Sequence, residues 1–373
     1  MRLANVISLG IKELRSLGRD PFMLGLIVYS FTLAIYSSAT AVPETLNNAP
    51  IAIVDEDHSP LSERISGAFY PPTFSRPVFI TLTEMDSRMD AGHDTFALVI
   101  PSGFQRDLMA GRGATIQLNV DATRVAQAFT GSGYIQSVVR DEVARFLARQ
   151  ASTPPNPAEL ALRVRFNPQL SKSWFGSVME LINQITMLSI ILTGAALIRE
   201  REHGTIEHLL VMPITPVEII LAKIWSMGLV VMVACIVALL GIVQGLLDVP
   251  IGGSVLLFLT GVALHLFATT SMGIVLGTVA RSMPQLGLLF VLVLLPMQML
   301  SGGTTPRESM PEIIQTVMLV APTTHFVSLA QAILFRGAGW AAIWPQMAAL
   351  GAIGLALFGY AAVRFRRSIS TSA

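Results

Sequence analysis

Residues 253–280 read GSVLLFLTGVALHLFATTSMGIVLGTVA and contain no Asp, Glu, Lys or Arg. A helix of roughly 20 mainly apolar residues crosses the hydrocarbon core of a bilayer. This run exceeds that length and carries no charge that would have to enter the lipid. We therefore predict that 253–280 is a transmembrane helix.

Five further apolar windows of suitable length occur, at 22–42, 176–198, 223–247, 284–303 and 340–363. Apolar residues make up 52% of the chain, charged residues 13%, and mean hydropathy is +0.62, which is the composition of a membrane protein. We predict an α-helical membrane protein with six transmembrane helices. The first window could instead be a cleaved signal peptide, because Ala39-Thr40-Ala41 resembles a cleavage site, but its apolar run is long enough to span.

Arginine and lysine gather on one side of the predicted helices. Cytoplasmic loops carry an excess of these residues, so their positions give the orientation. They lie before the first window (Arg2, Lys12, Arg15, Arg19), between the second and third (Arg199, Arg201, Lys223), between the fourth and fifth (Arg281), and after the sixth (Arg364, Arg366, Arg367). We predict a multi-pass protein of the bacterial inner membrane with both termini, including the tail 364–373, in the cytoplasm.

Residues 1–21 form a separate N-terminal segment. Val6, Ile7, Ile11, Leu14 and Leu17 fall near one face of a helix, which is typical of a helix lying in the membrane interface. We predict a cytoplasmic interfacial helix that Asp20-Pro21 separates from the first span. The alternative is a simple cytoplasmic extension.

Residues 43–175 are expected to form an extracytoplasmic α/β domain inserted between the first and second spans. Strand patterns occur at 51–54, 96–100, 116–120 and 162–166, and a long helical pattern runs from 122 to about 150. The only cysteine of the chain, Cys235, lies in an apolar window, so the domain contains no internal disulfide. A second extracytoplasmic segment, 304–339, contains the apolar run 313–320, which is too short to span. We predict that this segment dips into the outer leaflet of the membrane or covers the outer end of the helix bundle.

The loop and helix at 199–222 carry the densest charge of the chain. Their sequence begins Arg199-Glu200-Arg201-Glu202-His203-Gly204-Thr205-Ile206-Glu207 and continues to Pro213 and Pro216. A surface helix of this kind would present charge to a soluble partner and pass force into the adjoining spans. Alternatively, the charges only fix the topology of the loop.

This stretch resembles the permease subunits of the ABC-2 exporter family, in which Glu-x-Gly-Thr-x-Glu-x-Leu-Leu precedes a Pro-x-x-Pro turn. The resemblance extends over the whole chain, including Lys12-Glu13-Leu14 and Arg19-Asp20-Pro21. It implies a dimer, with a second permease copy or a related permease domain, above two ABC ATPase subunits. It also implies that the stretch from Arg199 to Glu207, with Arg199, Glu200, Arg201, Glu202, Gly204, Thr205 and Glu207, is the ATPase coupling surface. A periplasmic adaptor that docks on the external domain is a further implied partner.

The chain carries no nucleotide site of its own. A P-loop places lysine directly after glycine, whereas the three lysines follow Ile11, Ser171 and Ala222. We therefore expect no enzymatic activity in this chain and ATP with Mg²⁺ only in a partner. The six histidines show no metal-binding spacing, so we expect no metal site. The net charge of +1 without a basic block argues against nucleic acid.

Polar residues within the spans are candidates for a translocation pathway, because they are costly in lipid. These candidates are Glu180, Asn183, Gln184, His265 and Gln298. The competing interpretation is that they pack helices together. The sequence as a whole favours an export permease driven by a separate ATPase. A membrane-anchored receptor or assembly factor that acts through the external domain is the alternative, and a proton-driven carrier is a third.

Overall fold

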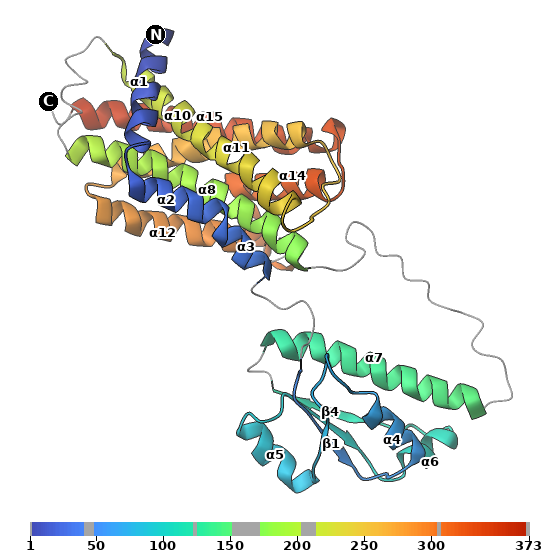
Figure 1. Ribbon diagram of the computed structural model, residues 1–373. Helices are drawn as coiled ribbons and strands as arrows, with labels where there is room; N and C mark the ends of the chain where they lie inside the picture. Colours follow the sequence, from blue (N-terminus) through green and yellow to red (C-terminus); the bar gives the residue numbers. More distant parts are fainter. Residues whose placement is uncertain are drawn as a thin grey trace. The chain divides into compact units, whose positions relative to one another are not determined.

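A computed structural model describes residues 2–40, 48–121, 125–150, 172–202, 214–303 and 307–370. The chain divides into two compact units. One, the membrane unit, comprises Met1–Val42 and Arg163–Ala373, and the other, the inserted unit, comprises Pro43–Leu162 (Figure 1). Each is described separately.

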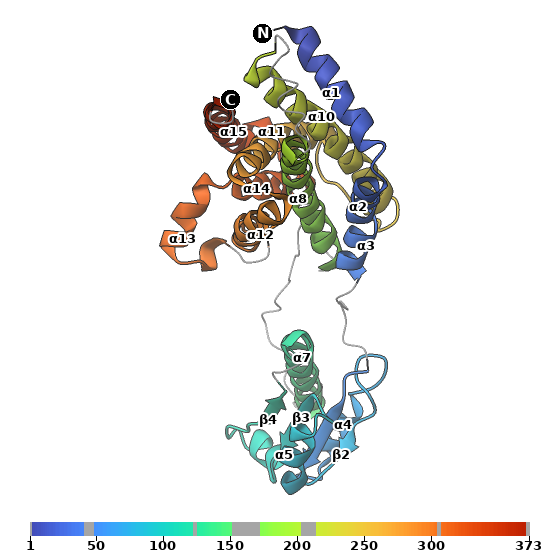
Figure 2. The same ribbon diagram turned by 90° about the vertical axis from the view of Figure 1, so that its left-hand side faces the viewer.

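The membrane unit consists of helices (Figures 1 and 2). Their bounds are α1 (Leu3–Leu17), α2 (Pro21–Phe31), α3 (Leu33–Thr40), α8 (Lys172–Glu202), α10 (Pro216–Val237, continued by a π-helix at Ala238–Gln244), α11 (Val255–Val279), α12 (Met283–Met299), α13 (Glu312–Val317), α14 (Pro322–Leu334) and α15 (Trp340–Ser370). The prediction of a mostly helical protein with several membrane-length helices is confirmed.

Within the described residues, five helical segments are long and apolar enough to cross a membrane: Pro21–Thr40, Ser173–Glu202, Pro216–Gln244, Val255–Val279 and Trp340–Arg367. The apolar helix α12, predicted as the span 284–303, has 17 residues, or about 25 Å of helix against about 30 Å of hydrocarbon. It ends at Met299, before a turn in which Gly302 has φ +92°. In the predicted re-entrant segment 304–339, Glu312–Val320 and Pro322–Leu334 meet at 92°, which could count as a sixth, broken span.

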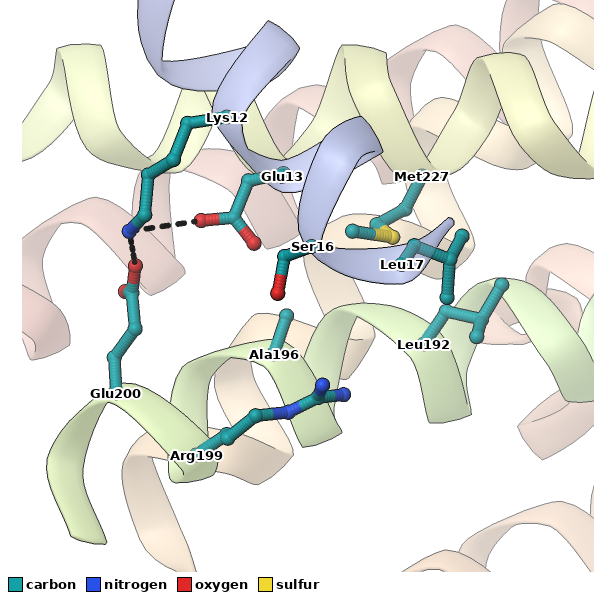
Figure 3. A pocket seen from close by; sticks show the side chains of 9 residues that line it. All are labelled: Lys12, Glu13, Ser16, Leu17, Leu192, Ala196, Arg199, Glu200 and Met227. Carbon is teal, nitrogen blue, oxygen red and sulfur yellow. Dashed lines mark hydrogen bonds and ion pairs between the residues drawn. The ribbon is translucent and has the colours of Figure 1, made fainter. Parts of the chain in front are cut away.

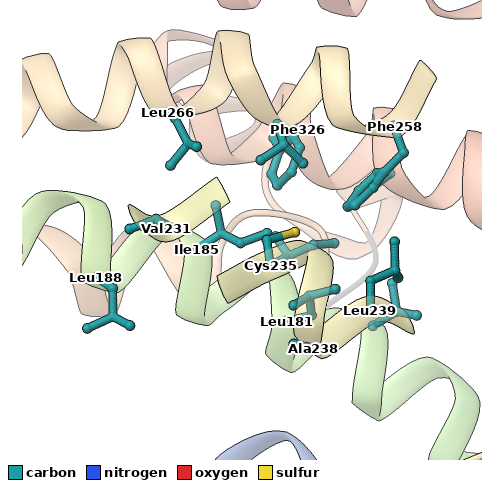
Figure 4. Close-up of a cluster of buried hydrophobic side chains, with 14 of the residues drawn as sticks. Leu181, Ile185, Leu188, Val231, Cys235, Ala238, Leu239, Phe258, Leu266 and Phe326 are labelled. Carbon is teal, nitrogen blue, oxygen red and sulfur yellow. The ribbon is translucent and has the colours of Figure 1, made fainter. Parts of the chain in front are cut away.

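Helix α8 is the most buried span and lies at the centre of the membrane unit, with α2, α10, α11 and α12 around it in Figure 2. Its apolar side chains contribute to a core shared with α10, α11 and α14. Figure 4 shows part of this core: Leu181, Ile185 and Leu188 of α8, Val231 and Cys235 of α10, Phe258 and Leu266 of α11, and Phe326 of α14. A displacement of either end of α8 would therefore alter its contacts with most helices of the membrane unit.

Small residues bring α8 and α11 into close contact. A Cβ atom added to Gly273 of α11 would lie 2.6 Å from the carbonyl oxygen of Ile190, and one on Gly194 of α8 would lie 3.2 Å from that of Gly273. Ser189 Oγ also donates a hydrogen bond to Thr269 Oγ1 across the pair, at 2.7 Å. Small residues and hydroxyl bridges are the usual means by which helices associate in lipid.

The inserted unit contains a four-stranded sheet of order β2-β1-β3-β4, formed by Val78–Phe79, Ile51–Asp55, Phe96–Ile100 and Gln117–Val120. The first three strands are parallel, and β4 is antiparallel to β3. Alternate side chains of β1 and β3 pack on α5 (Leu82–Asp90) on one face. The others pack on α4 (Pro60–Gly67), α6 (Phe104–Met109) and α7 (Val125–Gln150). The strands predicted at 51–54, 96–100 and 116–120 are present, whereas the one at 162–166 lies outside the described residues.

The close contact between α8 and α11 at Gly194 and Gly273, which we call the seam, leads to a prediction about stability. We expect Gly273→Ala to lower the thermal midpoint of the detergent-purified chain, because its methyl group would overpack the seam at a cost of about 1–3 kcal/mol. Gly228→Ala in α10 is the matched control, since a Cβ there has no neighbour within 4 Å. An equal or smaller effect of Gly273→Ala than of the control would contradict the close contact.

Candidate functional site

The last turn of α8 carries the first four residues of the predicted coupling surface. Helix α8 continues past the predicted end of the span at residue 198 and ends at Glu202. Arg199, Glu200, Arg201 and Glu202 are therefore part of a rigid span and not of a separate surface helix. Gly204, Thr205 and Glu207 lie outside the described residues, which resume at residue 214, and α10 begins at Pro216.

A group of four charged side chains, three of them buried, connects this last turn to two other helices. Lys223 of α10 lies with its Nζ 3.1 Å from Glu13 Oε1 of α1 and 2.8 Å from Glu200 Oε2 of α8. Lys12 of α1 lies with its Nζ 2.7 Å from Glu200 Oε1 and 3.6 Å from Glu13 Oε1 (Figure 3). We call Lys12, Glu13, Glu200 and Lys223 the charge cluster. It connects α1, α8 and α10.

Burial makes the charge cluster an unusual arrangement. The side chain of Lys223 is 2% exposed, those of Glu13 and Glu200 are each 9% exposed, and that of Lys12 is 49% exposed. Removing a charge from water costs several kcal/mol per ion, so such groups persist only where opposite charges and hydrogen bonds compensate them. Two ammonium and two carboxylate groups balance here, and Lys223 also approaches the carbonyl oxygen of Ala196 at 3.5 Å. The three helices are thereby held in one register.

The two α1 members of the cluster have shifted pKa values. Burial raises the pKa of Glu13, as does the nearby carboxylate of Glu200, while the ammonium of Lys223 acts in the opposite direction. For Lys12, burial by itself lowers the pKa, but its hydrogen bond to Glu200 and the surrounding negative charge outweigh this and raise it. Lys12 therefore remains a cation at neutral pH, while Glu13 takes up a proton more readily than an exposed glutamate.

Arg199 connects the last turn of α8 to the turn between α1 and α2. Its Nη1 lies 3.2 Å from Asp20 Oδ2. The other carboxylate oxygen of Asp20 accepts a hydrogen bond from the backbone N–H of Met23 at 3.1 Å and so caps α2. Asp20 therefore caps one helix and pairs with another, which explains the bend between the N-terminal helix and the first span.

Arg201 and Glu202 extend the connections of α8 to the turn between α11 and α12. Arg201 Nη1 donates to the carbonyl oxygen of Ala280 at 2.7 Å, just past the end of α11. Glu202 Oε1 accepts from the backbone N–H of Met283 at 3.1 Å, where α12 begins. A carboxylate at a helix N-terminus is favourable because it meets free N–H groups and the positive end of the helix dipole. Movement of this turn would therefore affect helices on both sides of α8.

Helix α1 lies against α10 by the face that carries Glu13. Gly10 approaches the indole of Trp225 so closely that an added Cβ would overlap the ring, and Trp225 Nε1 donates to the carbonyl oxygen of Val6 at 3.1 Å. Of the predicted apolar face, Val6 and Leu17 are buried. Ile7 and Ile11 remain 45% and 39% exposed, an apolar surface suited to the membrane interface.

The predicted pathway residues do not form one group. Gln184 Nε2 donates to Glu180 Oε1 at 2.5 Å within α8, with Asn183 half-buried beside them. His265 of α11 is fully buried, with Nε2 2.8 Å from Thr186 Oγ1 and its ring stacked 4.1 Å from that of Phe326. Successive helix residues are turned by about 100°, so Gln184 and Thr186 point in nearly opposite directions from α8. His265, which contacts Thr186, therefore lies on a different side of α8 from Gln184.

Gln298, the last pathway candidate, is half-buried on α12 two residues after Pro296. His265 makes contacts that also pack helices together, and a role of all five candidates in a pathway stays a prediction. In the part of the chain that the structure describes, no group of three or more His, Cys, Asp or Glu side chains could hold a metal ion.

A sequence profile described as "ABC-2 family transporter protein" matches residues 22–363. The chain belongs to the ABC-2 transporter family. Among relatives of this ABC-2 chain, "Inner membrane transport permease YhhJ" of Escherichia coli K12 is 62% identical over all of this chain and 99% of its own length. "Probable multidrug ABC transporter permease YbhR" of the same organism is 27% identical over 96% of this chain and 97% of its own. These relatives are named as transport permeases, and YhhJ is named as an inner-membrane protein.

Sequence reasoning missed the charge cluster of this ABC-2 protein. Lys12 and Lys223 served there to give orientation and to exclude a P-loop, and Lys12 and Glu13 also belonged to the family resemblance, but none of them was predicted to form an ion pair. The signal was the scarcity of lysine: the chain contains Lys12, Lys172 and Lys223 alone, and two of these three meet in the cluster. Composition cannot show that residues 12, 200 and 223 meet, because their contact depends on how three helices pack.

The cluster predicts a large effect of removing one of its charges. We expect Lys223→Met to destabilise the detergent-purified chain by about 3–5 kcal/mol, because Glu13 and Glu200 would remain buried without their shared cation. Adding Glu200→Gln should recover part of the loss, since one uncompensated charge is then removed. Arg281→Met, at an exposed arginine, serves as the control. Thermal unfolding midpoints measure all three, and strict additivity of the two cluster substitutions would contradict direct pairing.

Proposed function

We propose that this chain is the membrane-spanning subunit of an exporter that moves its substrate out across the inner membrane, using ATP hydrolysed by a separate ATPase subunit. The observation that carries the proposal is the charge cluster. It joins α8, which leads directly into the predicted coupling stretch, to α1 and α10. Membership of the ABC-2 family and the names of the relatives support the transport role.

The contacts suggest how force would enter the membrane. An ATPase that pushes on residues 199–207 would act on the last turn of α8. Through Glu200 and Lys223 the displacement would reach α10, and through Lys12 and Arg199 it would reach α1 and the start of α2. Because ion pairs and charge-assisted hydrogen bonds are short and directional, the helix ends would move as one body. The spans would then reorient together.

The partner ATPase follows from what the chain lacks and from its family. The sequence has no lysine placed to reach nucleotide phosphates, so ATP and Mg²⁺ would be bound by that partner. A second copy of this chain, or a related permease domain, would complete the membrane assembly. A periplasmic adaptor would dock on the inserted unit.

The proposed orientation places both termini and the charge cluster on the cytoplasmic side and residues 43–175 outside. The distribution of arginine and lysine supports this orientation. It is also consistent with the exposed apolar surface of α1, which would lie in the cytoplasmic interface beside the cluster.

Coupling can be tested by neutralising the carboxylates of the last turn. In a complex of this chain with its ATPase, we expect Glu200→Gln and Glu202→Gln each to lower transport-linked ATP hydrolysis at least about tenfold, roughly 1.4 kcal/mol of lost coupling. ATP binding by the ATPase subunit should be unchanged. Glu63→Gln, on an exposed face of α4 in the inserted unit, is the matched control.

Two outcomes would contradict the proposal. Unchanged transport-linked hydrolysis in both variants would remove the coupling role from the last turn of α8. Normal export in a strain lacking the chain would favour the receptor or assembly-factor alternative. The purified chain alone should show no ATPase activity, which is measured in the same assay.

A further inference from the structure

The membrane unit contains a second polar site, which shares no residue with the charge cluster. A cavity of about 490 Å³ lies where α8 begins, between the turn after α12 and helix α14. In Figure 1 the start of α8 and α14 lie toward the same end of the unit. The volume is within the range of about 300–1,000 Å³ that small-molecule sites occupy. None of the predicted pathway residues lines it.

Two arginines give the cavity a positive charge. Arg307 and Arg336 both line it, and no Asp or Glu is among its described lining residues. Arg307 Nη2 donates to the carbonyl oxygen of Gln315 at 3.2 Å, which fixes the side chain and leaves its other N–H groups available. The guanidinium of Arg336 has no hydrogen-bond partner among the described residues, and the residue is exposed. Planar guanidinium groups of this kind bind carboxylate and phosphate oxygens.

Helix α14 adds a row of neutral hydrogen-bonding groups. Thr324, Ser328 and Gln331 are spaced by four and three residues, so they share one face of the helix, and all three line the cavity. Thr324 is 4% exposed, and its hydroxyl has no hydrogen-bond partner within the described part of the chain. A buried hydroxyl without a partner is unfavourable, so a ligand oxygen close to Thr324 would remove a cost that the empty site carries.

Another part of the lining is apolar. Phe175, at the start of α8, is 42% exposed, and its ring stacks on that of Phe335 with centroids 6.1 Å apart. Val327 of α14 lies in the same lining. The cavity therefore offers cations and hydroxyl groups together with an aromatic surface. Such a combination suits a molecule that has a charged head and an apolar body.

We propose that this cavity binds the anionic head group of an amphiphile, with Arg307 and Arg336 pairing with the charge, Thr324 and Ser328 hydrogen bonding to head-group oxygens, and Phe175 contacting the apolar part. The amphiphile is either a phospholipid of the surrounding membrane or the exported substrate itself. Both would carry an anionic head group and an apolar body. The proposal does not depend on the ATPase partner, because binding is measured on the permease alone.

The test uses the full chain purified in an uncharged detergent. Binding of dioctanoylphosphatidylglycerol, dioctanoylphosphatidylcholine and inorganic phosphate is measured by native mass spectrometry. We expect the anionic lipid to bind, and Arg336→Gln to weaken its binding at least tenfold by removing a cation. The substitution should leave the fold intact, since the Arg336 guanidinium has no hydrogen-bond partner among the described residues. Thr324→Val, which keeps the side-chain shape, should weaken binding to a smaller extent. Arg364→Gln, at an exposed arginine of α15, should leave it unchanged.

Three results would overturn the proposal: equal binding of the anionic lipid by Arg336→Gln and wild-type chain, equal binding of the zwitterionic lipid, or binding of inorganic phosphate as strong as that of the lipid. Thermal unfolding of each variant shows that lost binding does not come from lost folding.

The lipids that co-purify with the chain show whether the bound amphiphile is a membrane lipid or the exported substrate. Retention of phosphatidylglycerol by wild type but not by Arg336→Gln assigns a membrane lipid, and its absence from both, with Arg336-dependent binding of the added probe, assigns the exported substrate.

Discussion

The burial of Lys223 is the constraint on which the packing of α1, α8 and α10 depends. A lysine side chain that is only 2% exposed is costly to bury unless carboxylates are held beside its ammonium group. Glu13 and Glu200 meet that requirement only if α1, α8 and α10 keep one register. Apolar packing would tolerate small slides between these helices, whereas the ion pairs penalise them. The cluster therefore makes three helix ends behave as a single part.

Because α8 lies at the centre of the membrane unit, it connects the charge cluster to distant parts of that unit. At one end α8 carries the charge cluster, and along its length it packs tightly on α11 through Gly194 and Gly273. Near its beginning it borders the arginine-lined cavity through Phe175. A rigid helix with small residues at its main contact can shift against its neighbour without large side chains having to repack. The proposed coupling surface and the proposed binding cavity would thus lie at two ends of one element.

Much of the fold could be predicted from the sequence, because long charge-free windows such as 253–280 have few alternatives to a membrane helix. The strands at 51–54 and 96–100 were equally clear, since short apolar runs ended by turn residues are typical of buried strands. The length of the second helix could not be predicted: the charged residues suggested a separate coupling loop or helix from Arg199, whereas Glu200, Arg201 and Glu202 all have partners and continue α8. The charge cluster depends on contacts between distant residues, which no local pattern contains.

The most direct test of the account measures whether α1 and α10 move as one body. Spin labels at Arg15 of α1 and Leu229 of α10, both exposed, are introduced into a Cys235→Ala chain assembled with its ATPase. Their distance distribution is then compared without nucleotide and with ATP bound. The account predicts the same narrow distribution in both states, and a broader one after Lys223→Met. A shift of the mean distance with ATP in the labelled chain that keeps Lys223 would contradict it.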